Sequence, residues 1–423
     1  MNPMNKDIRL LSLFSGCGGL DLGFEGGFDI FKKCVNPQIH PDWLNGSSKK
    51  NILKLPETRF KTIFANDIFP AAKAAWVSYF RNNGNSPEDF KLESIVDLVK
   101  KNNSKNHIFP KAEIVTGGFP CQDFSVAGKR NGFNSHKSHN GDLLSMIDNP
   151  TEENRGKLYM WMKKVIEIVE PKVFIAENVK GLISLSDTKA IIENDFRNVS
   201  SGYVVVDAQV LYAPSYGVPQ TRERIFFIGF KKSCLTKEAL KALTQEHISP
   251  EFNPYPIPTH GSNETLLSNN KELLAYVTTS DVLNDLPEPE SSNDLSHQSF
   301  SKAKWYGKHC QGQTEIDLGG LGPTIRSEHH GNIEFRRLAI EHGGKYHHEI
   351  NNGLKERRLS VRECARIQTF PDNFEFVRKP ENRNDDYKIS VSDGYRLVGN
   401  AVPPLLGYHI ATRLQELWPK LWK

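Results

Sequence analysis

A cysteine at position 121 has the surroundings that point most directly to chemistry. It stands in GGFPCQDFS, Gly117 to Ser125, immediately after the apolar run Glu113 to Thr116. Ligands of α/β proteins bind at the carboxyl ends of strands, and the proline before Cys121 fixes the backbone there. A free cysteine is more often buried and inert, but the flanking Gly, Pro, Gln and Ser favour an exposed loop. A thiol has an ordinary pKa of about 8.5, so a nucleophilic Cys121 needs a cationic neighbour or removal of its proton during attack.

A carboxyl group is predicted at the end of another strand. The segment PKVFIAENVKGL, Pro171 to Leu182, is apolar up to Ala176 and then delivers Glu177 and Asn178 to the carboxyl end of that strand. A carboxyl group held in such a place can have its pKa raised and act as an acid. It could equally cap the segment that follows, and the residues alone leave both roles open.

Two arginines precede a third apolar run, Ile225 to Phe230. They occupy alternate positions in PQTRER, so an extended chain points Arg222 and Arg224 to the same face. Guanidinium groups in that place can hold a carbonyl or a phosphate. Paired arginines are often only a solvated or ion-paired surface, and for this motif by itself that alternative is favoured.

A glycine-rich turn is the candidate site for a nucleotide-like ligand. In LFSGCGGLDLGF, Leu13 to Phe24, a hydrophobic strand enters Gly16, Gly18 and Gly19 before a helix. Missing side chains let a ligand approach the backbone, and the helix N-terminus faces it. The next strand ends in Ala65-Asn66-Asp67-Ile68, which places an acid where doubly wound folds bind ribose hydroxyls. A tight turn and a helix-capping aspartate are the simpler alternatives.

These segments require a sheet to position them. From Arg9 to about Phe230, short β-branched or apolar runs alternate with helix-like stretches, which is the pattern of an α/β sheet with helices on its faces. The predicted strands are Leu10 to Phe14, Thr62 to Ala65, Glu113 to Thr116, Val173 to Ala176, Tyr203 to Leu211, Ile225 to Phe230 and, with a weaker pattern, Ser94 to Leu98. The predicted helices of this part are Ala71 to Tyr79 and Leu158 to Val169.

The second half of the chain has a different texture. After Phe230, Pro, Asn, Ser and His become frequent and periodicity weakens until about Arg358, which predicts a second domain. Helical spacing returns at Val361 to Gln368 and at Leu405 to Leu417. Polar segments at about Pro37 to Leu55 and Asn134 to Glu153 are predicted to be surface insertions.

Composition sets outer limits on the class of protein. A chain of 423 residues exceeds the usual single core, so a large and a smaller domain are expected. No apolar run is long enough to cross a bilayer, and the N-terminus lacks a secretory cleavage site. The six cysteines contain no CxxC pair, which disfavours a disulfide framework and a zinc site and favours a reducing cytoplasm. The net charge of +4 does not by itself establish nucleic-acid binding.

Taken in order, the motifs resemble the DNA (cytosine-5) methyltransferases of bacterial restriction-modification systems. The resemblance extends almost from end to end. It is carried by FSGCGG, AND, GFPCQDFS, RGKLY, ENVKGL, QTRERIFFIG, RLSVRECARIQTFPD and YRLVGNAVPP. Mainly the two insertions and about Lys231 to Glu356 lie outside it.

The resemblance implies a Rossmann-like, S-adenosylmethionine-dependent methyltransferase sheet with a small, irregular target-recognition domain. The catalytic domain would comprise residues 1–230 and 357–423, with the C-terminal helix returning to it, and the recognition domain residues 231–356. By the same comparison, the S-adenosylmethionine site would be lined by Phe14, Ser15, Gly16, Gly18, Gly19, Asp67, Ile68, Pro120, Leu158, Asn400 and Val402. An aspartate that holds the adenine amino group in the family is not matched here, where Glu93-Ser94-Ile95 is aligned.

The mechanism implied by the family begins with addition of a Cys121 thiolate to carbon 6 of a cytosine, which makes carbon 5 nucleophilic. Glu177 would lie near ring nitrogen 3, while Arg224 and Arg222 would hold the base carbonyl or the loop against phosphates. Stacked cytosine hides both carbons, so the base must be extruded from the duplex. No residue is assigned to remove the carbon 5 proton, and water could do so.

Contacts with double-stranded DNA are predicted in two places. The loop after Cys121 resembles the family's mobile catalytic loop, with Ser125, Lys129 and Arg130 as DNA contacts. Within GLGPTIRSEHHGNIEFRRL, Gly320 to Leu338, Thr324-Ile325 is similar to the family's Thr-Leu signature, and Arg326 and Arg336 are predicted to read guanine edges. The adjacent His329 and His330 lack a second spaced pair of ligands, so no metal is predicted.

Other expectations follow from the resemblance and its rivals. A cognate restriction endonuclease would be a partner in the system, without physical contact, and no membrane is involved. An RNA cytosine methyltransferase is disfavoured by the long recognition region, and a catalytically silent DNA-binding regulator by the intact Cys121, Glu177, Arg222 and Arg224. A Rossmann dehydrogenase lacks support because no hydride-transfer constellation is present.

Overall fold

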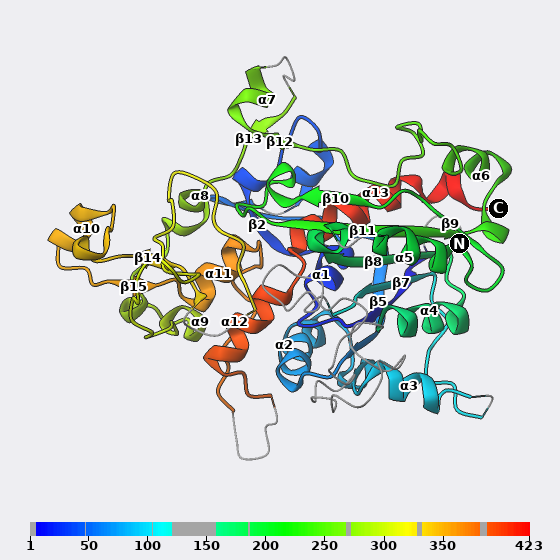
Figure 1. Cartoon of the computed structure of the whole chain (residues 1–423), viewed down its shortest axis with the longest axis horizontal. Coiled ribbons are helices and arrows are strands. Elements are labelled where there is room, and N and C mark those ends of the chain that lie inside the picture. Colours follow the sequence, from blue (N-terminus) through cyan, green and yellow to red (C-terminus); the bar gives the residue numbers. More distant parts are fainter. Residues whose placement is uncertain are drawn as a thin grey trace.

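A mixed sheet organises the chain (Figure 1). The computed structural model describes residues 6–46, 48–103, 105–120, 158–184, 187–267, 272–327, 332–380 and 387–423. In these ranges the sheet has eight strands in the order β10-β11-β8-β7-β1-β5-β6, with β9 also paired to β11. The strands are β1 (Ile8–Leu13), β5 (Phe60–Asp67), β6 (Phe90–Leu92), β7 (Ile114–Gly118), β8 (Val173–Val179), β9 (Tyr203–Val205), β10 (Gln209–Tyr212) and β11 (Glu223–Lys231).

The central strands are parallel, and the antiparallel ones lie together at one side. Strands β8, β7, β1, β5 and β6 pair in parallel, whereas β11 is antiparallel to β8, β9 and β10. The carboxyl ends of β5, β1, β7 and β8 therefore meet at one edge. The predicted α/β fold is confirmed, as are five of the predicted strands.

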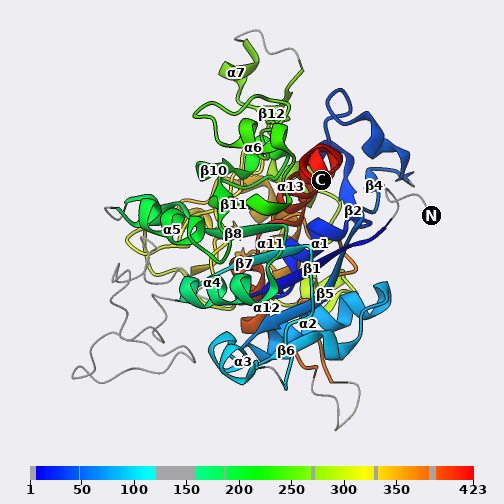
Figure 2. The same ribbon diagram turned by 90° about the vertical axis from the view of Figure 1, so that its right-hand side faces the viewer.

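Helices cover both faces of the sheet because successive residues of each strand point to opposite sides. Leu10 belongs to one buried cluster and Leu11 to the other. The first cluster includes residues of α1 (Gly19–Glu25), α2 (Pro70–Phe80) and α13 (Pro404–Leu421). The second includes residues of α3 (Ile95–Lys101), α4 (Leu158–Val169) and α5 (Thr188–Arg197). Figure 2 shows α4 and α5 on one side of the sheet and α13 on the other.

The C-terminal helix closes the first layer. Helix α13 packs along α1, and a Cβ atom at Gly23 would lie only 2.4 Å from the Pro404 carbonyl oxygen. This close approach explains why a residue without a side chain stands in the middle of α1. The predicted helices Ala71 to Tyr79, Leu158 to Val169, Val361 to Gln368 and Leu405 to Leu417 are all confirmed.

Two strand predictions were wrong. The weaker candidate, Ser94 to Leu98, is the start of helix α3, because the Ser94 hydroxyl accepts a hydrogen bond from Val96 N at 3.3 Å and caps the helix. Strand β6, just before it, was not predicted. The run Tyr203 to Leu211 is two strands rather than one, since the chain leaves the sheet at Ala208, whose N–H donates to the Glu193 carboxylate at 3.0 Å.

The remaining elements are short. A small antiparallel sheet contains β2 (Asp29–Phe31), β4 (Ile52–Lys54) and β3 (Ser48–Lys49). The others, in chain order, are α6 (Lys237–Leu243), β12 (His260–Gly261), α7 (Asn263–Leu267), β13 (Leu274–Ala275), α8 (Thr279–Leu283), α9 (Leu295–Gln298), β14 (Phe335–Arg337), α10 (His347–Asn351), β15 (Arg357–Arg358), α11 (Val361–Ile367) and α12 (Val391–Asn400). None of the helices in the described part of the chain has the length and apolarity that a membrane crossing requires.

The insertion predicted at Pro37 to Leu55 is partly built into the core. Trp43 is buried, with its ring 4.7 Å from that of Tyr408 on α13, and it stacks on His40 at 4.0 Å. The prediction of a surface segment is therefore right for the exposed residues around it and wrong for Trp43, Leu53 and Leu55, which are buried. The second predicted insertion, at 134–153, lies outside the described residues.

A buried carboxyl group in α1 predicts a pH-dependent stability. Burial raises the pKa of Glu25 to about 7, although its carboxylate accepts a hydrogen bond from Thr62 N at 2.9 Å. The folded state thus favours the protonated form, so the contribution of Glu25 to stability is greatest below pH 4.5 and declines as the pH rises to 7. Glu25→Gln keeps an acceptor for Thr62 N and removes the charge. We expect its free energy of unfolding to exceed that of the wild type by up to about 3 kcal/mol at pH 8 and to match it near pH 4. Urea unfolding across this pH range measures the difference, and parallel curves would contradict it.

Candidate active site

The residues that precede Cys121 lie against Glu177. In the pairing of β7 with β8, Gly118 is opposite Glu177, and a Cβ atom at Gly118 would lie 2.8 Å from Glu177 Oε2. The Asn178 side chain donates a hydrogen bond to the Phe119 carbonyl oxygen at 3.2 Å. The ENV and GFPC motifs are therefore neighbours at the sheet edge, as the order of parallel strands predicts. Cys121 itself lies outside the described residues.

Glu177 forms an ion pair with Arg224. The Arg224 Nε atom lies 2.9 Å from Glu177 Oε1, and the two side chains are only 14% and 11% exposed. Burial raises the pKa of the Glu177 carboxyl, and the positive charges of Arg224 and Arg222 oppose that rise. The site thus holds a carboxyl group that can be protonated more readily than one in water, beside a fixed guanidinium.

Arg222 lies before β11 and is bound to the backbone of distant segments. Its guanidinium donates to the carbonyl oxygens of Ile325, Gly399 and Ala401 at 3.1, 2.9 and 2.7 Å. The residue is 1% exposed. The sequence predicted that the two arginines point to the same face. In the structure their partners differ: Arg224 pairs with the Glu177 carboxylate, whereas Arg222 binds backbone carbonyl oxygens at a junction of three chain segments.

These different environments predict different losses on substitution. Arg222→Lys leaves buried carbonyl oxygens without a donor, so we expect the free energy of unfolding to fall by roughly 1–3 kcal/mol. Arg224→Lys keeps a positive charge beside Glu177 at a more exposed position, and we expect turnover to fall at least about tenfold with little change in stability. Urea unfolding and steady-state turnover on both variants test this contrast, and equal losses of stability would contradict it.

The glycine-rich turn is bound to the end of β5. Ser15 N donates to the Asn66 carbonyl oxygen at 2.8 Å, and Gly16 N donates to Asp67 Oδ2 at 2.9 Å. Asp67 Oδ1 also accepts from Phe69 N at 3.0 Å. In this structure Asp67 shapes the turn and does not cap α2, whose N-cap residue is Phe69. It lies at the strand end where the sequence predicts a ribose site.

Three glycines of this turn have different physical requirements. Phe14, Gly16 and Gly18 have φ angles of 52°, 54° and 86°, in the left-handed region. At Gly18 a Cβ atom would lie 2.6 Å from Trp76 Cδ1, and at Gly19 it would lie 2.4 Å from the Val402 carbonyl oxygen. At Gly16 it would meet nothing within 4 Å. Gly18 and Gly19 are thus needed for packing, and the space beside Gly16 is open.

The other predicted cofactor residues have varied exposure. Ile68 is 46% exposed beside Asp67, and Asn400 is exposed at the end of α12, whereas Val402 is buried next to Gly19. Pro120 is half-buried, and Leu158 lies in a buried cluster with Phe119. In the aligned Glu93-Ser94-Ile95 stretch, Glu93 pairs with Lys101 and Ser94 caps α3. The strand ends bring Phe14, Ser15, Gly16, Asp67, Ile68 and Pro120 to one edge.

The predicted DNA-reading residues are bonded within the chain. Thr324 donates its hydroxyl to the Thr221 carbonyl oxygen. Arg326 pairs with Glu334 at 3.4 Å, and Arg336 pairs with Glu349 at 3.1 Å. Ser125, Lys129 and Arg130 lie outside the described residues. A role of these residues on DNA stays a prediction.

Two glutamines that the sequence reading did not single out hold the junction beside Arg222. Gln220 is fully buried, and its side-chain oxygen accepts from Ile325 N at 2.9 Å. Gln368, which directly follows α11, donates to the Val398 carbonyl oxygen at 2.8 Å. Gln220 lies in QTRER and Gln368 lies in RECARIQ, two motifs that carry the family resemblance. Membership in those motifs is the sequence signal that could have identified them.

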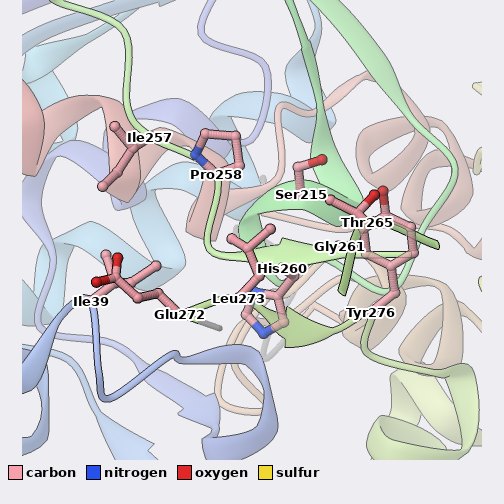
Figure 3. A pocket seen from close by; sticks show the side chains of 10 residues that line it. All are labelled: Ile39, Ser215, Ile257, Pro258, His260, Gly261, Thr265, Glu272, Leu273 and Tyr276. Carbon is pink, nitrogen blue, oxygen red and sulfur yellow. The ribbon is translucent and has the colours of Figure 1, made fainter. Parts of the chain in front are cut away.

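A separate cavity lies beside β12 (Figure 3). Its volume is about 370 Å³. It is lined by Ile39, Ser215, Ile257, Pro258, His260, Gly261, Thr265, Glu272, Leu273 and Tyr276, so none of the predicted site residues lines it. Burial lowers the pKa of His260 to about 4, and its ring nitrogens lie 2.9 Å from Thr259 Oγ1 and 3.3 Å from the Lys33 carbonyl oxygen. The imidazole is thus a bonded, neutral group, and the cavity has no part in the proposed chemistry.

The described ranges contain no metal-ligand cluster and no disulfide. There, no group of three or more His, Cys, Asp or Glu side chains is arranged to hold a metal ion. His329 and His330 lie outside those ranges. The cysteines described, Cys17, Cys34, Cys234, Cys310 and Cys364, are all free thiols.

The fold is shared with methyltransferases of known structure. A DNA modification methyltransferase encoded within an E. coli prophage superposes with a TM-score of 0.54 at 20% identity, covering 98% of this chain and 100% of that one. The S. pombe Dnmt2 methyltransferase superposes with a TM-score of 0.51 at 15% identity, covering 97% and 99%. The mostly parallel sheet therefore has the same Rossmann-like fold as these two structures.

The sequence comparisons define the family. The model of the C-5 cytosine-specific DNA methylases matches residues 8–416. The type II methyltransferase M.BsuRI of Bacillus subtilis is 32% identical over 409 residues, covering 96% of this chain and 78% of the relative. M.FnuDI of Fusobacterium nucleatum is 30% identical over 427 residues, covering 97% and 94%. The chain therefore belongs to the C-5 cytosine-specific DNA methylase family and is a DNA (cytosine-5-)-methyltransferase.

Proposed function

We propose that the chain transfers a methyl group from S-adenosylmethionine to carbon 5 of a flipped cytosine in a specific duplex sequence, through a covalent Cys121 adduct. The observation that carries the proposal is the contact of Gly118 with Glu177, whose carboxylate is 2.9 Å from Arg224. Cys121 is three residues beyond Gly118, and three residues span at most about 11 Å. The proposal requires the thiol, on this short tether, to turn toward the buried acid and the guanidinium.

Carbon 5 of cytosine is a weak nucleophile, and addition of the thiolate to carbon 6 activates it. The Cys121 thiolate forms a bond to carbon 6. The electron pair of the 5,6 double bond then forms a 4,5 double bond, and the pair of the double bond between carbon 4 and nitrogen 3 moves onto nitrogen 3, which takes up a proton. Carbon 5 is then nucleophilic enough to accept a methyl group, which bound S-adenosylmethionine would supply from its sulfonium, leaving a neutral thioether. Loss of the carbon 5 proton, which water can accept, restores the 5,6 double bond and expels the thiolate, and nitrogen 3 returns its proton to Glu177.

Glu177 and Arg224 supply the electrostatics of the addition. A carboxyl group whose pKa is raised by burial can donate a hydrogen bond or a proton to nitrogen 3 as negative charge develops in the ring. Arg224 orients that carboxyl group through the Nε contact at 2.9 Å and can reach the carbonyl oxygen of the base. Arg222 acts on the site through its charge and through the junction that it holds.

The residues at the strand ends fit S-adenosylmethionine. Open space beside Gly16, an acid at Asp67 and the exposed apolar Ile68 suit the backbone approach, the ribose hydroxyls and the flat base of a nucleoside. Phe14, Ser15, Gly18, Gly19, Pro120, Leu158, Asn400 and Val402 complete the proposed set. When bound, the group supplies a methyl carried on a sulfonium.

We propose residues 231–356 as the part that reads DNA and residues 1–230 with 357–423 as the catalytic part. Support comes from the short, irregular elements between α6 and β15 and from the return of α13 to α1. The two parts share buried residues, since Ile325 and Ile333 belong to the same cluster as Leu405. Proposed DNA contacts are Ser125, Lys129, Arg130, Thr324, Arg326 and Arg336.

The biological setting follows from the relatives. Several of them are named type II methyltransferases, which supports a role in protecting host DNA from a cognate restriction endonuclease in the bacterial cytoplasm. The mechanism requires no physical contact between the two enzymes.

Transfer of labelled methyl groups tests the proposal. Duplex DNA and a structured RNA are incubated with tritiated S-adenosylmethionine, and the nucleosides are separated. We expect label in 5-methyldeoxycytidine from duplex DNA only. Label on the exocyclic nitrogen of cytosine, or in RNA alone, would overturn the proposed reaction.

A further inference from the structure

We infer that the loop Lys302–Gln311, here called the KWY loop, is a phosphate-contacting arm that docks on the backbone of duplex DNA. The inference rests on the proposed function and adds a contact surface to it. The loop has the sequence KAKWYGKHCQ, with three lysines, a histidine and no acid. Lys304, Tyr306, Lys308 and His309 are exposed, and Tyr306 is 60% exposed.

A buried arginine holds both ends of the KWY loop. Arg358 is 1% exposed, and its guanidinium donates to the carbonyl oxygens of Ala303 and Lys304 at 2.8 and 3.1 Å. It also donates to Gly312 O, just beyond the loop, at 2.8 Å. Fixing both ends on one side chain reduces the conformational entropy that the loop loses on binding.

Aromatic packing holds the middle of the loop. The Trp305 ring stacks on His342 with centroids 4.4 Å apart and an angle of 16°, and its Nε1 donates to the Gln313 carbonyl oxygen at 3.2 Å. Exposed and half-buried side chains alternate from Lys302 to Lys308, so Ala303 and Trp305 face the protein and the lysines and Tyr306 face outward. The loop therefore presents its cations on a supported ridge.

The anchor places the loop beside the segment proposed to read bases. Arg358 donates to the Ile333 carbonyl oxygen as well, and its guanidinium lies 4.0 Å from the centre of the Phe335 ring. The KWY loop and the 332–338 segment thus share one buried residue. A surface that reads bases and an arm that contacts phosphates are expected to be neighbours, because phosphate contacts set the register of the protein on DNA.

Charge separates this loop from the arginines nearby. Arg326 and Arg336 are paired with Glu334 and Glu349, so much of their charge is neutralised within the chain. Among the residues that the structure describes, Lys304 and Lys308 form no ion pair. Unpaired lysines on a ridge without acids match the uniform negative charge of a nucleic-acid backbone.

Substitution of the two lysines tests the inference. Lys304→Ala with Lys308→Ala is compared with Lys237→Ala with Lys241→Ala on α6, an exposed pair at the opposite end of the molecule (Figure 1). We expect the loop variant to bind duplex DNA about tenfold more weakly at 0.1 M salt, and the slope of log K against log salt to become shallower by about 1–2. The loss should appear in KM for DNA and not in KM for the methyl donor.

The outcomes separate this inference from the proposed function. Suppose that the wild-type enzyme methylates DNA and that the loop variant binds DNA with the same affinity and salt slope as the α6 variant. That result would overturn the role of the KWY loop and leave the proposed function intact. A wild-type enzyme that transfers no methyl group to DNA would overturn the proposed function. Loss of RNA binding in place of duplex binding would assign the loop to a different partner and overturn the inference.

Discussion

Glu177→Gln is expected to lower the rate of methyl transfer by about 10²- to 10⁴-fold, the usual contribution of a positioned acid. Glutamine keeps the volume of the side chain and its place beside Gly118, but it cannot give up a proton to nitrogen 3 or form an ion pair with Arg224. Single-turnover methyl transfer at saturating DNA measures this step directly. The binding of DNA and of the methyl donor should change little.

The pH dependence and a control variant sharpen this prediction. Because burial raises the pKa of Glu177, the protonated form that donates is more populated, and activity should fall as the pH rises above that pKa. The Gln variant should lose this limb of the profile. Glu170→Gln is the control, because it removes a more exposed carboxylate near the other end of β8. The Glu170 carboxylate lies 3.3 Å from Lys231 Nζ, and its loss should leave the rate unchanged. Equal rates for Glu177→Gln and Glu170→Gln would contradict the proposed role.

Gly18→Ala is expected to raise the Kd for S-adenosylmethionine at least about tenfold and to destabilise the fold by roughly 1–3 kcal/mol. The new Cβ atom would lie 2.6 Å from Trp76 Cδ1 and 2.7 Å from Phe80 Cε2, at a φ angle of 86°. The turn must shift to relieve both contacts, and Gly16, which borders the open space, shifts with it. Calorimetric titration of the methyl donor and urea unfolding measure the two effects.

Substitutions at two other glycines distinguish the cost of backbone strain from the cost of a steric clash. Gly84 has a φ angle of 98° and open space around its Cβ position, so Gly84→Ala carries the backbone cost alone and should leave donor binding intact. Gly16→Ala fills space that we assign to the ligand, so it should weaken donor binding with a smaller loss of stability than Gly18→Ala. Normal donor binding by both Gly16→Ala and Gly18→Ala would contradict the proposed cofactor site.

The sheet edge that holds the site could be predicted from the sequence because the signals for it are local. Each motif directly follows an apolar run, and parallel strands put their carboxyl ends together. This reasoning brings Gly118 to Glu177 and Gly16 to Asp67, as observed. It failed at Ser94, where three apolar residues suit a strand or a short helix equally and a single capping hydroxyl decides between them.

The division of labour between similar residues could not be predicted. Arg222 and Arg224 have the same chemistry and nearly the same position, but the partners of Arg222 are carbonyl oxygens about 100 and 180 residues away in the chain. In the same way, the sequence predicts that Arg336 can bind a guanine edge, but in the structure its guanidinium pairs with Glu349. Such pairings depend on packing between distant segments, which periodicity and motif spacing do not encode.

Covalent trapping is the measurement that tests the central claim most directly. Duplex DNA with 5-fluorocytosine at the target position cannot lose a proton from carbon 5, so after methyl transfer the adduct should persist. With the wild type and S-adenosylmethionine, we expect a complex stable to denaturant whose cross-linked peptide contains Cys121, and none with Cys121→Ser, although that variant still binds DNA. A complex formed equally by Cys121→Ser, or a cross-link mapped to another residue, would contradict the account.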